Sequence, residues 1–332
     1  MSLRNLIFHT RFTLLSVGKI MTKLHVKPNC GLRKLTSFDL RLKRCLEIPD
    51  EVQFYKGSYC HGLEALCILL KRLAYPCRYC DMVPRFGRSV PDLCKITHLI
   101  LNHIYVRKSH LLQRWDSPFL TQDSLQTYAN VIHAKGAPLS NCFGFIDGTV
   151  RPICRPGKHQ RDVYNGHKRV HSIKFQSIVI PNGLIANLSG PWEGRKHDAG
   201  MLAESGLMRD LERIAYSPTG ETLCIYGDPA YPLRVYLQAP FRDANLTDEM
   251  KAYNKAMNSV RVSVEWLFGE IVKYFRCTDF KRGLQLRLSP IGKIYIVCAI
   301  LQNAHACLYG NIVSEYFQLQ PPTLEEYLQL QE

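Results

Sequence analysis

The chain has 332 residues and is 46% hydrophobic, which is enough for a sizeable core in one large domain or two smaller ones. Its 43 lysines and arginines outnumber its 28 acids, and the net charge of +15 suits a polyanionic partner such as DNA or the ribosome, although charge alone does not require one. Thirteen scattered cysteines exclude a disulfide framework, and no stretch approaches the apolar length of a membrane span, which argues against a membrane partner.

The first 38 residues contain no acid but several lysines and arginines, Arg4 and Arg11 among them. We predict that residues 1–40 form a disordered basic arm that contacts phosphates. The same composition also fits a mitochondrial presequence, or a start region added to an older domain.

Residues 41–115 are predicted to form an all-helical block that resembles a helix-turn-helix. An apolar helix follows His61 and ends before Pro76, and Gly87 marks a turn. Ser89 then has the character of an N-cap for a second helix. Contact of this block with DNA is one interpretation, and packing against the rest of the chain is the other. The basic side chains that would contact the DNA backbone are Arg88 and Lys95, with His98 and Lys108 as further candidates.

Residues 116–140 contain Asp116-Ser117-Pro118 and Gly136-Ala137-Pro138, a composition typical of a linker with one short helix. The predicted catalytic domain covers residues 141–312. It includes an insertion at about 233–252, which we expect to be a loop with a short helix. Residues 313–332 are predicted to be a C-terminal tail.

Two aspartates close apolar runs that are typical of buried strands. Asp147 follows Cys142-Phe143-Gly144-Phe145-Ile146, and Asp228 follows Leu223-Cys224-Ile225-Tyr226-Gly227. Between them, two alternating runs joined at Pro181-Asn182-Gly183 predict a hairpin. Asp198 is predicted to cap the helix that begins at Ala199, with a supporting place near the other acids as the alternative.

A third acid, Glu265, lies at the edge of the apolar face of a predicted helix. Arg261 precedes it by four residues, so it falls on the same helical face and could orient the glutamate or meet a phosphate. Carboxylates at two strand ends and on one later helix can converge on a single point.

These three acids suit phosphodiester cleavage by two divalent cations, Mg²⁺ or Mn²⁺. Two such ions can activate the attacking oxygen and neutralise the leaving one, and hard carboxylate oxygens are the ligands they prefer. Asp147 would bridge the two ions, and Asp228 and Glu265 would each hold one. A basic run close to Asp147 could line the DNA path, although most charge runs are only solvated rims. Its DNA-backbone candidates are Arg155, Lys158, Arg161, Lys168 and Arg169.

Five pieces in order resemble the catalytic domain of the PIF/Harbinger (IS5-like) DDE transposase family. They are Ile146-Asp147-Gly148-Thr149, Gly194-Arg195-Lys196-His197-Asp198, Gly227-Asp228-Pro229-Ala230-Tyr231-Pro232, Arg261-Val262-Ser263-Val264-Glu265-Trp266-Leu267-Phe268-Gly269 and Cys298-Ala299-Ile300-Leu301-Gln302-Asn303. The chain departs from the family at Gln302, where the usual motif reads Leu-His-Asn.

The resemblance implies a ribonuclease-H-like catalytic domain, a mixed sheet flanked by helices, with Asp147, Asp228 and Glu265 as catalytic metal ligands. It implies a transposase-derived nuclease that cuts and joins DNA in the nucleus. An oligomer during catalysis and a separate Myb-like DNA-binding partner would also follow. The alternative is a catalytically silent DNA-binding or scaffold protein that kept the fold.

Overall fold

The centre of the molecule is a mixed six-stranded sheet in a computed structural model that describes residues 37–55, 57–242 and 245–329. Strand β5 pairs antiparallel with β3, β4 and β6, whereas β3, β7 and β8 run parallel to one another in that order. The predicted hairpin is present as β5 and β6, and Gly183 turns between them at φ +85°. The strands are β3 (Cys142–Pro152), β4 (Tyr164–Asn165), β5 (Val170–Val179), β6 (Ile185–Glu193), β7 (Cys224–Tyr226) and β8 (Leu237–Gln238).

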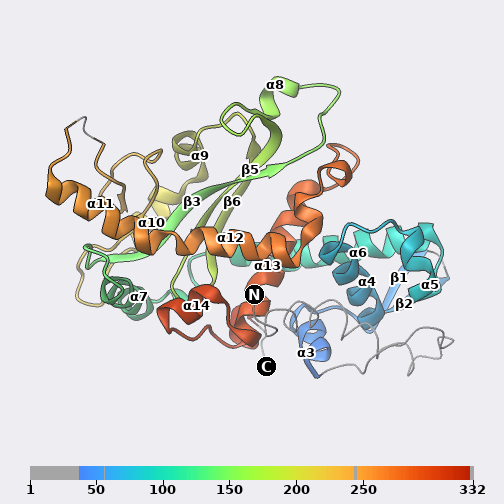
Figure 1. The fold of residues 1–332 in the computed structure, drawn as a ribbon. Coiled ribbons are helices and arrows are strands. Elements are labelled where there is room, and N and C mark those ends of the chain that lie inside the picture. The colour runs from blue at the N-terminus through green and yellow to red at the C-terminus, as the bar shows by residue number, and fades with distance from the viewer. Residues whose placement is uncertain (1–36, 56, 243–244, 330–332) are drawn as a thin grey trace, which may run out of the picture.

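Helices cover both sides of this sheet, so the predicted α/β class with a mixed sheet flanked by helices is confirmed. In Figure 1, α12 and α13 lie along one side of β3, β5 and β6, and α9 lies on the other. A short turn, α8, stands at the far end of β5 (Figure 1). The helices of this domain are α8 (Gln160–Val163), α9 (Asp198–Ser205), α10 (Leu207–Ile214), α11 (Asp248–Arg261), α12 (Ser263–Tyr274) and α13 (Ile291–Tyr309).

The block before the six-stranded sheet has the predicted helix, turn and capped helix. Gly87 ends the turn in the left-handed conformation, and the Ser89 hydroxyl accepts a hydrogen bond from the Asp92 backbone N–H at 3.3 Å. The all-helical prediction was wrong, because β1 and β2 form an antiparallel hairpin ahead of α4. The elements are α3 (Ser37–Cys45), β1 (Glu51–Tyr55), β2 (Ser58–His61), α4 (Gly62–Ala74), α5 (Val83–Phe86) and α6 (Val90–Lys108).

Two basic side chains of this block that were DNA-contact candidates pair with acids within the protein. The Arg88 guanidinium donates to both carboxylate oxygens of Glu64, at 2.6 and 2.9 Å, and Glu64 is only 5% exposed. The Lys108 ammonium is buried and donates to Glu47 at 2.6 Å and to the Leu328 carbonyl at 2.9 Å. Buried charges are stable only when they are paired, so Lys108 is not available for a phosphate, whereas the DNA contact of the half-buried Arg88 stays a prediction.

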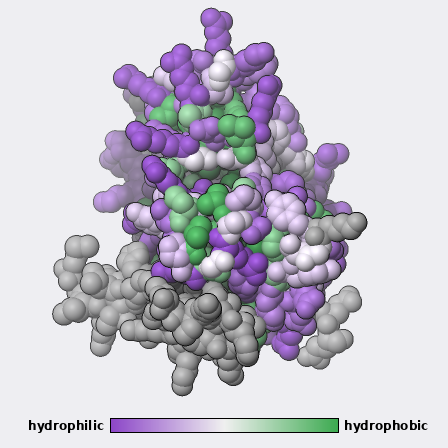
Figure 2. All heavy atoms as spheres, turned by 90° about the vertical axis from the view of Figure 1, so that its right-hand side faces the viewer, coloured by the Kyte–Doolittle hydropathy of each residue, from purple (hydrophilic) through white to green (hydrophobic). Residues whose placement is uncertain are grey.

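Lys95 and His98 remain exposed on α6. Figure 2 shows this side of the molecule, where hydrophilic side chains cover much of the visible described surface and hydrophobic ones form separate patches between them. The surface is compatible with a polar partner, and the DNA contact of Lys95 stays a prediction.

The segments predicted as linker and tail both contribute to the packed structure. Residues 116–140 contain α7 (Gln122–Ala134), whose apolar face packs on β3. Residues 313–332 contain most of α14 (Ile312–Phe317) and all of α15 (Leu324–Leu328), and α15 packs against α13 and α3. The predicted insertion also supplies β8 and the start of α11. Short amphipathic helices fail to stand out in sequence because their stability comes from packing and not from propensity.

Residues 1–36, most of the predicted basic arm, lie outside the described residues. The last part of that arm, residues 37–40, is the beginning of α3, so the predicted boundary at residue 40 is too late. Cysteines in the described ranges are all free thiols, as expected for a reduced protein.

Helix α13 crosses the core and carries the fifth family-like piece. Contrary to expectation, it is long and apolar enough to span a membrane, but 72% of the relevant window is buried inside the protein, as in a core helix. Asn303 uses its side-chain amide to accept from the Ile185 N–H and to donate to the Ile185 carbonyl, both at 2.9 Å. Gln302, at the departure from the family motif, donates to Glu270 at 3.1 Å. The residue that differs from the family motif therefore forms a hydrogen bond between α13 and α12.

Candidate active site

The two aspartates meet because β3 and β7 are parallel neighbours. Their last paired residues are Phe145 and Tyr226, and each aspartate lies two residues further along its own chain. Asp147 therefore does not end its strand as predicted. β3 continues to Pro152 because β5 still pairs with it there.

Local backbone contacts orient both carboxylates. Asp147 Oδ1 accepts from the Gly148 N–H at 2.7 Å, and Asp228 Oδ1 accepts from the Ala230 N–H at 2.9 Å. A side chain at Gly227 would lie 2.7 Å from the Tyr231 ring, so the turn into Asp228 requires glycine for close packing.

Glu265 reaches the same region through Arg261 and not by direct approach to the aspartates. Arg261 Nη2 donates to Glu265 Oε1 at 3.1 Å, and Arg261 Nη1 lies 3.5 Å from Asp147 Oδ2. The predicted pairing of Arg261 with Glu265 is thus present. The two residues lie on different helices, because α11 ends at Arg261 and α12 begins after Val262. Arg261 is 15% exposed and Glu265 is 55% exposed.

Burial and mutual repulsion disfavour the ionised aspartates. Burial raises the pKa of Asp147 to about 6, the Arg261 charge opposes this shift, and the charges of Asp228 and Asp198 add to it. Burial also raises the pKa of Asp228, and the Asp198 charge again contributes. Because the ionised forms of Asp147 and Asp228 are disfavoured in the free protein, a cation bound beside them would be strongly favoured.

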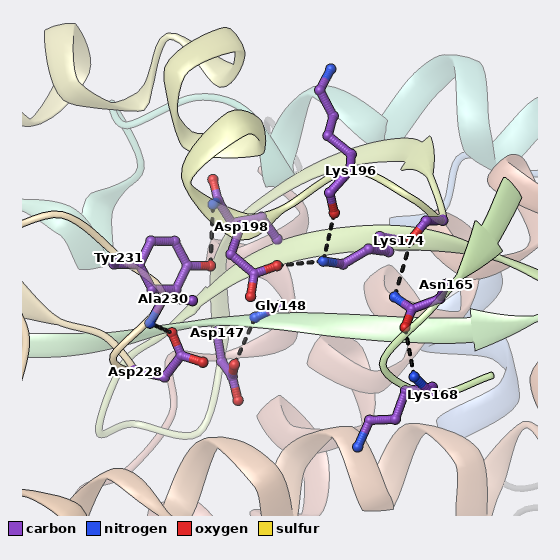
Figure 3. A network of polar contacts seen from close by, with 12 residues as sticks. Asp147, Gly148, Asn165, Lys168, Lys174, Lys196, Asp198, Asp228, Ala230 and Tyr231 are labelled. Carbon is purple, nitrogen blue, oxygen red and sulfur yellow. Dashed lines mark hydrogen bonds and ion pairs between the residues drawn. The ribbon is translucent and has the colours of Figure 1, made fainter. Parts of the chain in front are cut away.

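Asp198 belongs to this site, and its predicted role as the N-cap was wrong. His197 occupies the cap position, and its side chain makes no capping hydrogen bond. The Asp198 carboxylate instead accepts from the Lys174 ammonium at 2.5 Å, with Asp147, Gly148 and Asp198 close together in Figure 3. Sequence reasoning did not assign Lys174 to the acidic cluster. The available signal was a lysine between Ile173 and Phe175 in a predicted strand of the core, a position where unpaired charge is rare.

A cleft of about 1120 Å³ joins the acids to basic side chains. Asp147, Asp198, Asp228 and Glu265 all line it. Lys168 is the one predicted DNA-backbone candidate of the basic run among its lining residues, whereas Arg155, Lys158, Arg161 and Arg169 are exposed outside it. The basic lining residues are His167, Lys168, Lys174, Arg195, Lys196, His197 and Arg261.

The chemistry of the donor set fits a divalent cation. Carboxylate oxygens are hard ligands, and the half-buried Asp147 and Asp228 carry charge that the protein neutralises only in part. Within the described ranges, no three Asp, Glu, His or Cys side chains are grouped closely enough to hold a single ion. The residues that would hold ions are Asp147, Asp228 and Glu265, and the Arg261 guanidinium now links two of them.

Residues 146–303 match the family model described as the DDE superfamily endonucleases. Searches among curated proteins and among solved structures gave no match. The matched segment begins at the residue before Asp147 and ends at Asn303, so it contains every acid of the cleft. The match supports a DDE transposase-like endonuclease domain in this part of the chain.

Proposed function

We propose that this chain is a metal-dependent DNA endonuclease or transposase of the DDE type. The observation that carries the proposal is the convergence of Asp147 and Asp228 in one basic-rimmed cleft with Glu265 on its wall. The match to the DDE superfamily endonucleases over the same residues supports it. Two divalent ions, Mg²⁺ or Mn²⁺, complete the proposed site.

The protein's own groups have separable tasks in this proposal. Asp147, Asp228 and Glu265 would hold the cations, which on binding supply activation of the attacking oxygen and charge neutralisation at the leaving oxygen. Lys168 and Lys196 line the cleft and attract the phosphates of the scissile strand. Arg261 keeps Glu265 oriented toward Asp147 and balances the charge of both.

We further propose the finer assignment to the PIF/Harbinger group, with action in the nucleus as an oligomer. The ordered motifs from Ile146 to Asn303 support this assignment. A Myb-like partner would then supply sequence recognition, because contacts from cleft lysines to phosphates carry little sequence information. Strand joining would follow cutting when the freed 3′-hydroxyl attacks a second phosphodiester.

The second candidate function is a catalytically silent DNA-binding or scaffold protein. Arg261 favours it, since this side chain pairs with both Asp147 and Glu265 and so balances part of their charge. The two functions predict different products from the same DNA.

Purified protein incubated with supercoiled plasmid tests the proposed function. We expect nicked circles with Mn²⁺ or Mg²⁺, and none when EDTA is present. Binding of labelled duplex is measured in parallel, in Ca²⁺ and in EDTA, so that loss of cutting is distinguished from loss of DNA binding. Tight DNA binding without metal-dependent nicking, with and without nuclear extract to supply a partner, would support the silent alternative.

Metal binding is expected to weaken in acid. The pKa of Asp147 is raised to about 6, so below that pH the carboxyl group carries a proton and no longer serves as a ligand. Affinity for Mn²⁺ should therefore rise between pH 5 and pH 7, by roughly tenfold, and then level off. Calorimetric titration at the two pH values checks this, and a flat profile for the wild type would contradict the role of Asp147.

Lys168→Ala is expected to weaken DNA binding equally for unrelated sequences. The exposed ammonium lines the cleft. Its loss should therefore reduce the slope of the logarithm of the DNA-binding constant against the logarithm of salt concentration by about one. Fluorescence anisotropy over a series of salt concentrations measures that slope. Lys255→Ala, an exposed lysine on α11 outside the cleft lining, is the matched control and should keep the wild-type slope.

A further inference from the structure

Lys174 is a charged residue in an unusual position. It lies within β5, opposite Val150 of β3, and its side chain is only 8% exposed. Its ammonium donates to Asp198 Oδ1 at 2.5 Å and to the Lys196 carbonyl at 2.9 Å (Figure 3). Because an unpaired charge is very unfavourable in such surroundings, the position of the ammonium is determined by these two acceptors.

The ion pair determines where the Asp198 carboxylate lies. A Cβ atom on Gly148 would be 2.8 Å from Asp198 Oδ1 and 3.1 Å from its carboxyl carbon. Any residue larger than glycine at position 148 would therefore displace this carboxylate. Asp198 thus lies directly over the backbone that follows Asp147, although it comes from α9, a different element.

Only part of the Asp198 carboxylate is used by the protein. Oδ1 accepts from Lys174, whereas Oδ2 has no hydrogen-bond donor within the described part of the chain. Asp198 lines the same cleft as Asp147 and Asp228 and is 18% exposed there. A carboxylate that served only to neutralise a buried lysine would have no need to lie beside two other acids, where their repulsion disfavours it.

Building on the proposed function, we propose that Lys174 is a positioning residue of the metal site. It holds Asp198 across Gly148 so that Oδ2 is a further oxygen acceptor for the hydrated cation that Asp147 and Asp228 would hold. Mg²⁺ and Mn²⁺ suit such a role, because Mg²⁺ in particular keeps several waters that need acceptors around the ion. Outer partners of this kind affect metal affinity although they are not ligands themselves.

Calorimetric titration of the full chain with Mn²⁺ alone, without DNA, tests the proposal. We expect Lys174→Met and Asp198→Asn each to weaken binding by about tenfold or more. Lys174→Arg should recover part of the loss, since it keeps the charge. Lys255→Met makes the same chemical change on an exposed face of α11 and should bind as the wild type.

The double variant Lys174→Met/Asp198→Asn separates positioning from folding. It removes both charges of the pair, so no buried ion is left unpaired, and thermal melting should show a folded protein. We expect it to bind Mn²⁺ no better than Asp198→Asn. Recovery to within about threefold of the wild type would overturn the proposal, because the pair would then serve structure alone.

The other outcomes distinguish this inference from the proposed function. If Asp147→Asn abolishes Mn²⁺ binding while Lys174→Met leaves it unchanged, the metal site stands and the positioning role is refuted. If the wild type binds no Mn²⁺ at all, both the metal site and the role of Lys174 are refuted.

Discussion

Asp147→Asn is expected to reduce metal-dependent plasmid nicking by about a thousandfold or more, in line with losses measured for single catalytic residues elsewhere. The amide has nearly the same volume and keeps an oxygen for the Gly148 N–H, so the change removes charge with little change in shape. Without that charge the proposed site loses the carboxylate common to both cations. Initial rates of nicking with Mn²⁺ measure the effect.

The same substitution should not reduce stability at neutral pH. Burial raises the pKa of Asp147 from 3.8 to about 6, so ionisation opposes folding increasingly as pH rises from about 4 to about 6, and the penalty is fully present above that range. A neutral asparagine avoids this penalty. We therefore expect an unchanged or higher Tm at pH 7.5 together with lost activity.

An exposed acid provides the matched control for Asp147. Asp248→Asn changes the same functional group on the first residue of α11, where the side chain is 95% exposed, and nicking should stay at the wild-type rate. If Asp147→Asn nicks DNA as fast as the wild type does, the cleft is not the source of the activity.

Arg88→Met is expected to destabilise the protein by about 3 kcal/mol, because it leaves the buried Glu64 carboxylate without its cationic partner. Both guanidinium contacts are lost at once, and with them the link between α4 and the segment that leads into α6. Chemical denaturation followed by circular dichroism gives the change in the free energy of unfolding.

Two further variants test the reason for the Arg88 effect. Glu64→Gln combined with Arg88→Met removes the unpaired charge and should recover much of the lost stability. Lys95→Met, on the exposed side of α6, should change stability by less than about 1 kcal/mol. A loss of DNA affinity in Arg88→Met with unchanged stability would contradict the structural role and restore the DNA-contact interpretation.

The positions of the two aspartates were predictable because a local pattern encodes them. Each follows an apolar run, and these runs become parallel neighbouring strands whose pairing places Asp147 and Asp228 together, although β3 continues past Asp147. Glu265 and Arg261 were also predictable as a helical pair, since a spacing of four residues places two side chains on one face. The turns at Gly87 and Gly183 follow from backbone freedom that glycine alone supplies easily.

Other features depended on contacts between segments far apart in the chain. Arg88 and Lys168 are both basic residues in polar stretches, and only the tertiary structure pairs Arg88 with the buried Glu64 and leaves Lys168 exposed at the cleft. Residues 116–140 and 313–332 lacked a strong pattern because their helices are short and gain stability from the surfaces they cover.

By itself, the sequence determined the fold class, the order of the acids and the place of two of them directly after apolar runs, since periodicity and turn residues are local properties. The tertiary structure alone decided that Arg261 links Asp147 to Glu265 and that Lys174 holds Asp198 over Gly148. Partners 24 to 114 residues apart are chosen by the packing of whole strands and helices, and no spacing in the chain encodes that choice.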